Sequence, residues 1–316
     1  MGTVDTDIKA RLMAILCLVL MTGILPELLS GNTPAPILFR PDALIVFGLV
    51  YGLPVLVIRE WSVRLSVRPF GTFLAGMAYG LINEGLLART LFRQTGVPID
   101  VFDDYGFVLG VNLPWALYIT VWHGLSSVLF PIALTHFLLP GAARVAWLGK
   151  KTALALAFLS ILLPTLFFLN DETSGPKGSL PMLAALWLAM AILATAASSF
   201  RQESAPSPNP ARFKPFLLGL AAFAPMIAVL LVAHADTPLA IYFAGFALIA
   251  WLWSMPILRK HWQAALHWIA LGWYLQMTGL GAIALVKTSP VSVLAGFAAV
   301  ALLIVLVVRA DRKLAS

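Results

Sequence analysis

The stretch "AGMAYGLINEGLLARTLFRQTG", residues 75 to 96, places three polar side chains, Asn83, Glu84 and Arg89, in an otherwise apolar run. With the apolar residues before it, the run is about 20 residues long, enough for a helix to cross the roughly 30 Å hydrocarbon core of a bilayer. An ionisable group at mid-membrane costs about 2.5 to 3.5 kcal/mol on insertion scales. Glu84 therefore needs a partner or a function.

The whole chain shares this apolar character. Of its 316 residues, 60% are hydrophobic and 11% are charged, and the mean hydropathy is +0.92. These values exclude an ordinary water-soluble globular domain. The sequence therefore predicts an all-α fold, a polytopic bundle of transmembrane helices in the lipid bilayer of a cell membrane.

Ten apolar segments are long enough to be spans. They are residues 10 to 28, 43 to 58, 71 to 91, 113 to 139, 152 to 169, 180 to 199, 215 to 234, 239 to 257, 264 to 286 and 291 to 308. Basic residues are retained on the cytoplasmic side of a membrane, and 16 of the 21 lie in alternate connecting segments that include both ends of the chain. The predicted topology is about ten spans with both termini cytoplasmic. The net charge of +7 reflects this topology and does not predict a nucleic-acid partner.

One connecting segment has a composition of its own. Residues 201 to 215, "RQESAPSPNPARFKP", are rich in Pro and Ser, which interrupt helices. We predict that this cytoplasmic linker separates a six-span membrane region, residues 1 to 200, from a four-span membrane region, residues 216 to 316. The candidate polar site lies in the first region.

The third and fourth predicted spans carry the polar residues that point to function. Glu84 lies about seven residues, or roughly 10 Å, below the outer end of the third span. His123, in "YITVWHGLSSVLF", lies about ten residues, or roughly 15 Å, below the same surface on the returning span. The two side chains are therefore expected at similar depth on consecutive helices.

Helical periodicity places each of these residues on a polar or small-residue face. On the third span the face consists of Gly76, Gly80, Glu84 and Ala88, and on the fourth span it consists of Thr120, His123, Ser126 and Ser127. Small residues let two membrane helices approach closely, so we expect the two faces to meet and Glu84 to contact His123. A carboxylate beside an imidazole can activate a water, pass a proton or bind a divalent metal. It can also act only as an interhelical hydrogen bond.

The segment "GLINEGLLARTLF", followed by His123 on the next apolar segment, resembles the CPBP family of intramembrane proteases, the CaaX-processing and bacteriocin-immunity group. The resemblance covers about residues 70 to 140. It implies that Glu84 activates a water for peptide-bond hydrolysis in the membrane, that His123 assists, and that the substrate is a membrane-embedded peptide or protein. Asn83 occupies the position of the first Glu of the family's Glu-Glu pair, and Arg89 corresponds to its Arg. Arg89 lies five residues after Glu84 instead of four, which turns it about 140° away on an α-helix and makes a membrane-interface anchor its alternative role.

Two other functions remain open. Ten spans with a buried carboxylate and histidine are also suitable for a proton-coupled secondary transporter of a small solute. The replacement of a Glu by Asn83 fits a non-catalytic membrane protein built on a degenerate protease-like core. No P-loop or dinucleotide-binding motif is present, so the sequence predicts no nucleotide cofactor.

Acidic residues near the predicted outer surface could assist the site. The loop after the third span contains Asp100, Asp103 and Asp104, which can attract a cation or simply be solvated, and whose spacing is not that of an EF-hand. Glu27, His234 and Asp236 fall at the outer ends of spans, where they can line the same vestibule or contact water.

Overall fold

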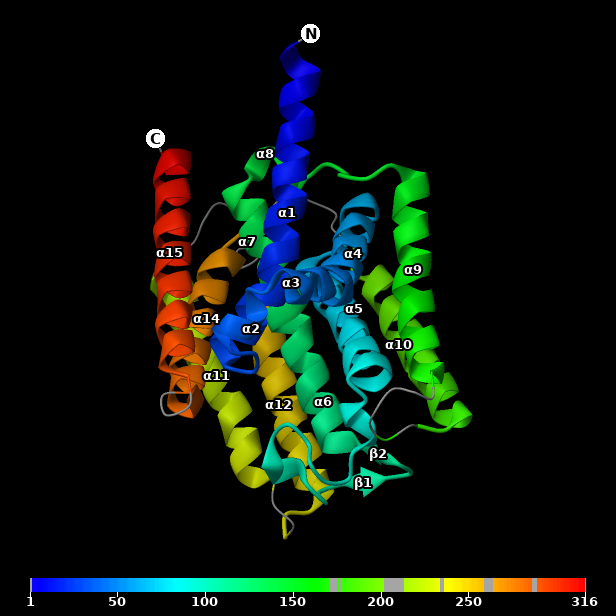
Figure 1. The fold of residues 1–316 in the computed structure, drawn as a ribbon. Helices are drawn as coiled ribbons and strands as arrows, with labels where there is room; N and C mark the ends of the chain where they lie inside the picture. The colour runs from blue at the N-terminus through cyan, green and yellow to red at the C-terminus, as the bar shows by residue number, and fades with distance from the viewer. Residues whose placement is uncertain are drawn as a thin grey trace.

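The computed structural model shows an almost entirely helical molecule (Figure 1). It describes residues 2–170, 176, 178–201, 213–233, 236–258, 264–285 and 289–315. Over these residues the all-α prediction is confirmed. The only sheet in the described part is a two-stranded hairpin, β1 (Phe107–Val108) with β2 (Val111–Asn112).

The chain up to residue 201 forms ten α-helices. They are α1 (Gly2–Ser30), α2 (Ala35–Leu38), α3 (Pro41–Phe47), α4 (Leu53–Arg64), α5 (Pro69–Leu81), α6 (Leu113–Trp122), α7 (Phe130–Leu138), α8 (Pro140–Ala143), α9 (Lys150–Leu169) and α10 (Leu180–Ser199). Three π-helical segments interrupt these helices: η1 (Gly48–Gly52), η2 (Ile82–Leu87) and η5 (His123–Leu129). Two short 3₁₀ turns, η3 (Thr90–Phe92) and η4 (Asp100–Phe102), lie in the loop after η2.

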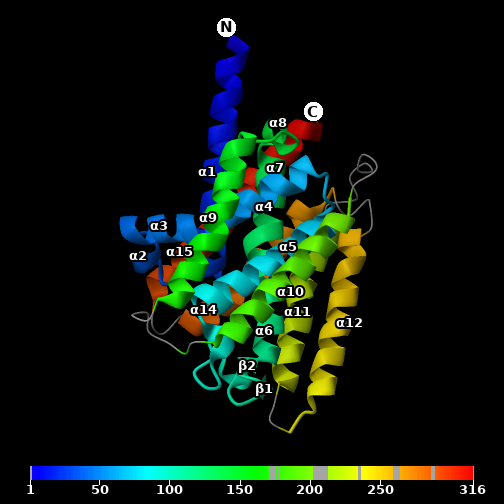
Figure 2. The same ribbon diagram turned by 90° about the vertical axis from the view of Figure 1, so that its right-hand side faces the viewer.

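The described residues after 212 form four long helices. They are α11 (Phe213–Val232), α12 (Leu239–Leu258), α14 (Leu266–Leu285) and α15 (Pro290–Ala315). Figure 2 shows α12 on one side of the bundle and the short helices α2 and α3 projecting from the other. Most of the Pro/Ser-rich linker lies outside the described residues.

The helices begin where the sequence removes a backbone donor or supplies a cap. Pro41, Pro69 and Pro290 are each the first residue of a helix, a position where the missing N–H costs nothing. At the start of α6 the Asn112 Oδ1 accepts a hydrogen bond from the Trp115 backbone N–H at 3.0 Å, the usual role of an N-cap. These local signals explain why most predicted span boundaries lie within a few residues of the observed ones.

Seven helical segments of the described residues are long and apolar enough to cross a membrane. They are Ile8–Ser30, Pro41–Arg64, Leu113–Leu138, Lys150–Leu169, Leu180–Ser199, Phe213–Val232 and Pro290–Leu314. The other three predicted spans coincide with α5 and η2, with α12 and with α14. The polytopic character is therefore supported, and the count of ten stays a prediction.

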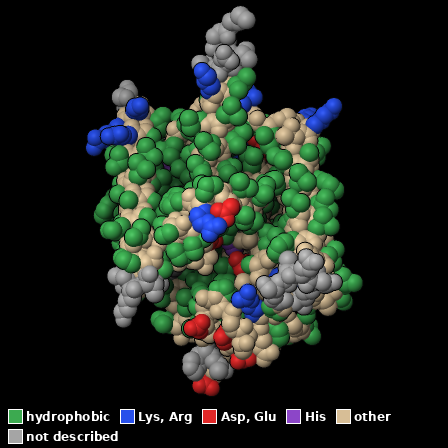
Figure 3. All heavy atoms as spheres, in the orientation of Figure 1, with side chains coloured by type: hydrophobic (Ala, Val, Ile, Leu, Met, Phe, Trp, Pro, Cys, Tyr) green, Lys and Arg blue, Asp and Glu red, His purple; other side chains and the backbone are tan. Residues whose placement is uncertain are grey.

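Charge is distributed unevenly along the bundle. Figure 1 shows both ends of the chain at the same end of the molecule, with the β1–β2 hairpin at the opposite end. On the face drawn in Figure 3, most Lys and Arg side chains lie at the end with the termini, Asp and Glu gather at the hairpin end, and a hydrophobic belt separates them. By the distribution of basic residues the end with the termini is the predicted cytoplasmic side.

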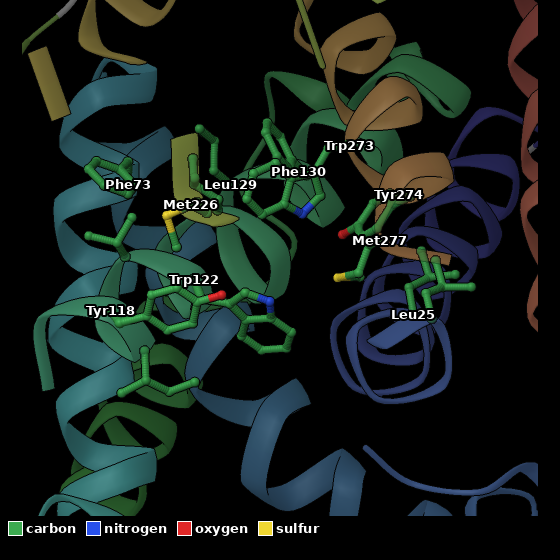
Figure 4. Close-up of a cluster of buried hydrophobic side chains, with 14 of the residues drawn as sticks. Leu25, Phe73, Tyr118, Trp122, Leu129, Phe130, Met226, Trp273, Tyr274 and Met277 are labelled. Carbon is green, nitrogen blue, oxygen red and sulfur yellow. The ribbon is translucent and has the colours of Figure 1, made fainter. Parts of the chain in front are cut away.

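The run from α6 through η5 to α7 is the centre of the bundle. In this segment 89% of the most apolar stretch is buried, against 17% for α9 and for α10. Figure 4 shows Trp122, Phe130, Trp273 and Tyr274 gathered in the hydrophobic cluster between this run and α14. Both predicted membrane regions therefore contribute to one core.

Candidate functional site

The Glu84 and His123 side chains are in contact. Glu84 Oε1 lies 2.9 Å from His123 Nε2. Glu84 is 8% exposed and His123 is 1% exposed, so the contact is shielded from solvent. The predicted contact between the two residues is confirmed, and their depth in the membrane stays a prediction.

Glycines bring the two helices together. A Cβ on Gly76 would lie 2.8 Å from the Gly124 Cα, and a Cβ on Gly80 would lie 2.9 Å from the Thr120 Cα. Neither position has room for a side chain without displacing backbone. The small-residue face of the third span therefore packs against the face that carries His123, as the periodicity predicted.

Both residues of the pair belong to π-helical segments. Glu84 lies within η2, which continues α5, and His123 is the first residue of η5, between α6 and α7. A π-helical turn adds a residue to the helix and is frequent at functional sites. The extra residue changes which side chains share a face, and sequence periodicity alone does not reveal it.

A second pair of side chains fixes the Glu84 carboxyl group. The Thr90 hydroxyl donates a hydrogen bond to Glu84 Oε2, and Trp115 Nε1 donates to Thr90 Oγ1 at 2.9 Å. Thr90 is 5% exposed and Trp115 is 2% exposed. The carboxyl group is thus held on one oxygen by Thr90 and on the other by His123.

The hydrogen bonds of His123 allow a proton to move. Its Nδ1 lies 3.1 Å from Ser127 Oγ, and its Nε2 lies 3.2 Å from the Asn83 amide nitrogen. Nε2 also faces Glu84 Oε1, so the proton of this contact can lie on either atom. Transfer of that proton to Nε2 gives a carboxylate and an imidazolium. The shared proton therefore has two positions, on Glu84 Oε1 and on His123 Nε2, which are 2.9 Å apart.

Aromatic rings surround the imidazole. The ring centroids of Trp122, Tyr79 and Tyr51 lie 5.0, 5.6 and 6.1 Å from that of His123. Tyr51 belongs to η1, so each of the three π-helical segments supplies a residue at the site. The predictions from sequence missed Tyr51 and Tyr79, because the apolar run around each of them gives no signal of the site.

Glu27 joins the site through Tyr51. The Tyr51 hydroxyl donates to Glu27 Oε1, while Asn32 Nδ2 and Thr33 Oγ1 donate to Oε2 at 2.7 and 2.6 Å. Glu27 is 4% exposed. Of the two alternatives for Glu27, contact with water is therefore excluded, because its side chain is buried and hydrogen-bonded to Tyr51. A second buried carboxyl group lies one tyrosine away from His123.

Arg89 does not join this group, and its predicted role as a membrane-interface anchor is wrong. Its side chain is 1% exposed, and Nη2 donates to the carbonyl oxygens of Phe167, Phe168 and Asn170 at 2.8 to 3.3 Å. These carbonyls end α9, where a cation is favourable. Arg89 has a φ of +56°, so the helix has already ended, and the 140° argument from α-helical geometry does not apply to it.

The remaining polar residues of the predicted faces separate. Thr120 donates to the carbonyls of its own helix, whereas Ser126 Oγ accepts from Trp273 Nε1 of α14 at 2.9 Å. Thr120 packs against Gly80 as the periodicity predicted, whereas Ser126 of the same predicted face is turned to α14. His234 lies outside the described residues.

The acidic outer loop is held by its own hydrogen bonds. The Asp103 carboxylate accepts from the backbone N–H groups of Gly96 and Val97 at 3.0 and 2.9 Å, and Asp104 Oδ1 accepts from Gln94 Nε2 at 2.9 Å. Within the described ranges, no three His, Cys, Asp or Glu side chains are grouped so that they could hold a metal ion.

Comparison with known proteins places the chain in a family. A model described as "Uncharacterized membrane protein family" matches residues 15–314. The chain belongs to this family. The match to the uncharacterized membrane protein family includes Glu27, Tyr51, Glu84 and His123. No curated protein and no solved structure matches the chain.

Proposed function

We propose that this member of the uncharacterized membrane protein family is an intramembrane hydrolase that cleaves a peptide bond of a membrane-embedded substrate. The observation that carries the proposal is the buried 2.9 Å contact between Glu84 and His123. General acid–base chemistry needs two groups that exchange a proton, held within hydrogen-bond distance of each other. The pair is predicted to lie in the outer half of the bilayer, with both termini cytoplasmic.

In the proposed reaction Glu84 acts as the base. Its carboxylate takes a proton from a water molecule whose oxygen attacks the peptide carbonyl carbon, and the peptide C–N bond then breaks. The proton passes through the Glu84–His123 pair to the nitrogen of the leaving amine. The products are a carboxylic acid and an amine, so no other reactant is needed.

The surroundings of the pair suit this role. Thr90 binds Glu84 Oε2, and Ser127 binds His123 Nδ1. These hydrogen bonds fix the orientation of the two reacting groups before a substrate binds. The Asn83 amide is a donor beside His123 Nε2, the nitrogen that faces Glu84. When His123 takes the proton, this donor is released and becomes free to bind a developing negative oxygen.

The test is peptide cleavage by purified protein in lipid vesicles that contain a library of membrane-embedded peptides, with new termini detected by mass spectrometry. Glu84→Gln and His123→Ala are each expected to lower the rate by about 100-fold or more, because general acid–base catalysis contributes at least that factor. Asp100→Asn is the control, since Asp100 is an exposed acid of the outer loop. Equal rates in the wild type and both site variants would refute the proposal.

A second function is favoured by one observation, the link from Glu27 through Tyr51 toward His123. Two buried carboxyl groups around one histidine can carry a proton across part of the bundle, as a proton-coupled transporter of a small solute requires. In that case vesicles with an imposed pH gradient would take up solute, Glu27→Gln would stop the uptake, and the peptide library would remain intact.

A further inference from the structure

An exposed ion pair stands on the apolar flank of the molecule. Arg40 Nε and Nη2 donate to the two carboxylate oxygens of Asp42 at 3.0 and 2.7 Å, and the two side chains are 61% and 66% exposed. In Figure 3 a blue and a red group lie side by side on the surface of the hydrophobic belt, between the two ends of the molecule. This position does not suit two exposed charges.

Contacts with α1 give the depth of this region. A Cβ on Gly23 would lie 3.1 Å from the Phe47 Cβ, and a Cβ on Gly52 would lie 2.7 Å from a methyl group of Val19. The end of α3 and the following η1 are therefore level with residues 19–23, the middle of the apolar segment Ile8–Ser30. Figure 1 likewise shows α3 about halfway between the hairpin and the end with the termini.

The side chains around the ion pair are apolar and equally uncovered. Ile37, Phe39, Ile45, Val46 and Leu49 are each 51% to 65% exposed. Charged side chains at this depth almost always face a bundle interior or pair with each other, because lipid offers no hydrogen bonds. Only two of the five N–H groups of Arg40 bind Asp42, and the structure shows no partner for the other three among the residues it describes.

We propose that the flank formed by α2 and α3 is the interface between two copies of this chain. The argument is charge complementarity. Arg40 and Asp42 carry opposite charges two residues apart, so a copy related by a two-fold axis can place its Asp42 against Arg40 and its Arg40 against Asp42. Such an isologous contact is the commonest arrangement of homodimers. It satisfies the spare donors of both guanidinium groups and covers the exposed apolar side chains.

The test uses charge reversal and complementation in lipid vesicles. Wild-type protein labelled with two fluorophores is expected to show dimers by single-molecule colocalisation. Arg40→Glu alone and Asp42→Lys alone each place like charges at the interface, and each is expected to weaken association at least tenfold. A mixture of the two variants restores opposite charges across the interface and is expected to associate like the wild type.

An apolar variant serves as a control in case the charge-reversal variants fail to fold. Arg40→Leu combined with Asp42→Leu introduces no repulsion, and its helix content and unfolding midpoint are measured beside the wild type. It is expected to fold and to lose the dimer, since the reciprocal ion pairs are absent. A monomeric wild type, a mixture that fails to associate although both variants fold, or an apolar variant that dimerises normally would each overturn the proposal. If the wild type is monomeric and library peptides bind at the flank formed by α2 and α3, this flank binds the substrate instead.

Discussion

An Arg59→Met variant is expected to lose about 3 to 5 kcal/mol of its free energy of unfolding, the usual cost of removing one partner of a buried ion pair. Arg59 and Glu60 in α4 are 0% and 1% exposed, and Arg59 Nη1 lies 2.8 Å from Glu60 Oε1. Without this guanidinium group, the buried Glu60 carboxylate loses its buried cation and keeps only the more distant and partly exposed Arg64. Methionine keeps most of the volume and removes the charge.

Arg59 also makes contacts that a methionine side chain cannot replace. Its Nε donates to His136 Nε2 at 3.0 Å, and its guanidinium carbon lies 3.5 Å from the centre of the Trp147 ring. The remaining N–H groups bind backbone carbonyls that follow α7, those of Ala142, Ala143 and Val145. Arg59 therefore holds α4 to α7, to α8 and to Val145 beyond α8 through four hydrogen bonds, beside the one that it donates to Glu60 in α4 itself.

The measurement is reversible unfolding in mixed micelles, followed by helix content. Arg64→Met is the matched control: Arg64 also contacts Glu60, at 3.3 Å, but its side chain is 27% exposed. Partly exposed ion pairs contribute about 1 kcal/mol or less. Similar losses in the two variants would show that burial of Arg59 is not what makes it important.

A Gly219→Ala variant is expected to be destabilised by about 1 to 3 kcal/mol or more, because the α11–α14 crossing has no room for a side chain. A Cβ at Gly219 would lie 2.0 Å from the Ile269 carbonyl oxygen, and a Cβ at Gly272 would lie 2.2 Å from that of Phe216. Both obstacles are backbone atoms, which cannot rotate away. The helices would have to separate.

Gly245→Ala in α12 is the control for Gly219→Ala. Outside its own helix, no atom of the described residues lies within 4 Å of a Cβ at Gly245, and alanine favours helix over glycine by up to about 1 kcal/mol. Unfolding midpoints are compared under the same conditions as for Arg59. A Gly219→Ala protein as stable as Gly245→Ala would contradict the close crossing of α11 and α14.

The sequence was sufficient to place Glu84 against His123. Helix length and rise fix the depth of a residue in a span, and the two depths agreed to about 5 Å. The recurrence of Gly76 and Gly80 identified the face along which the helices approach. Helix rise and the spacing of small residues are both properties of a single helix, so they can be read from the sequence without the tertiary structure.

The rest of the site could not be predicted in this way. Tyr51 comes from a different part of the chain, and no spacing relates it to His123. Arg89 looked like an interface anchor because its sequence position is near a span end, yet it is 1% exposed and binds carbonyls at the end of α9. The sequence around a residue does not indicate partners that are backbone carbonyls of a helix far away in the chain.

The sequence by itself determined the class of protein, the positions of its helices and the pairing of Glu84 with His123, because apolar length and helical period are local properties of the chain. Only the tertiary structure decided where the π-helical turns fall, and that Ser127 and Tyr51 lie beside His123 while Ser126 faces α14. It also decided that Arg89, beyond the end of its helix, binds the carbonyls at the end of α9. Except for the contact between Ser127 and His123, these contacts join segments that are far apart in the sequence, so neither apolar length nor helical period encodes them.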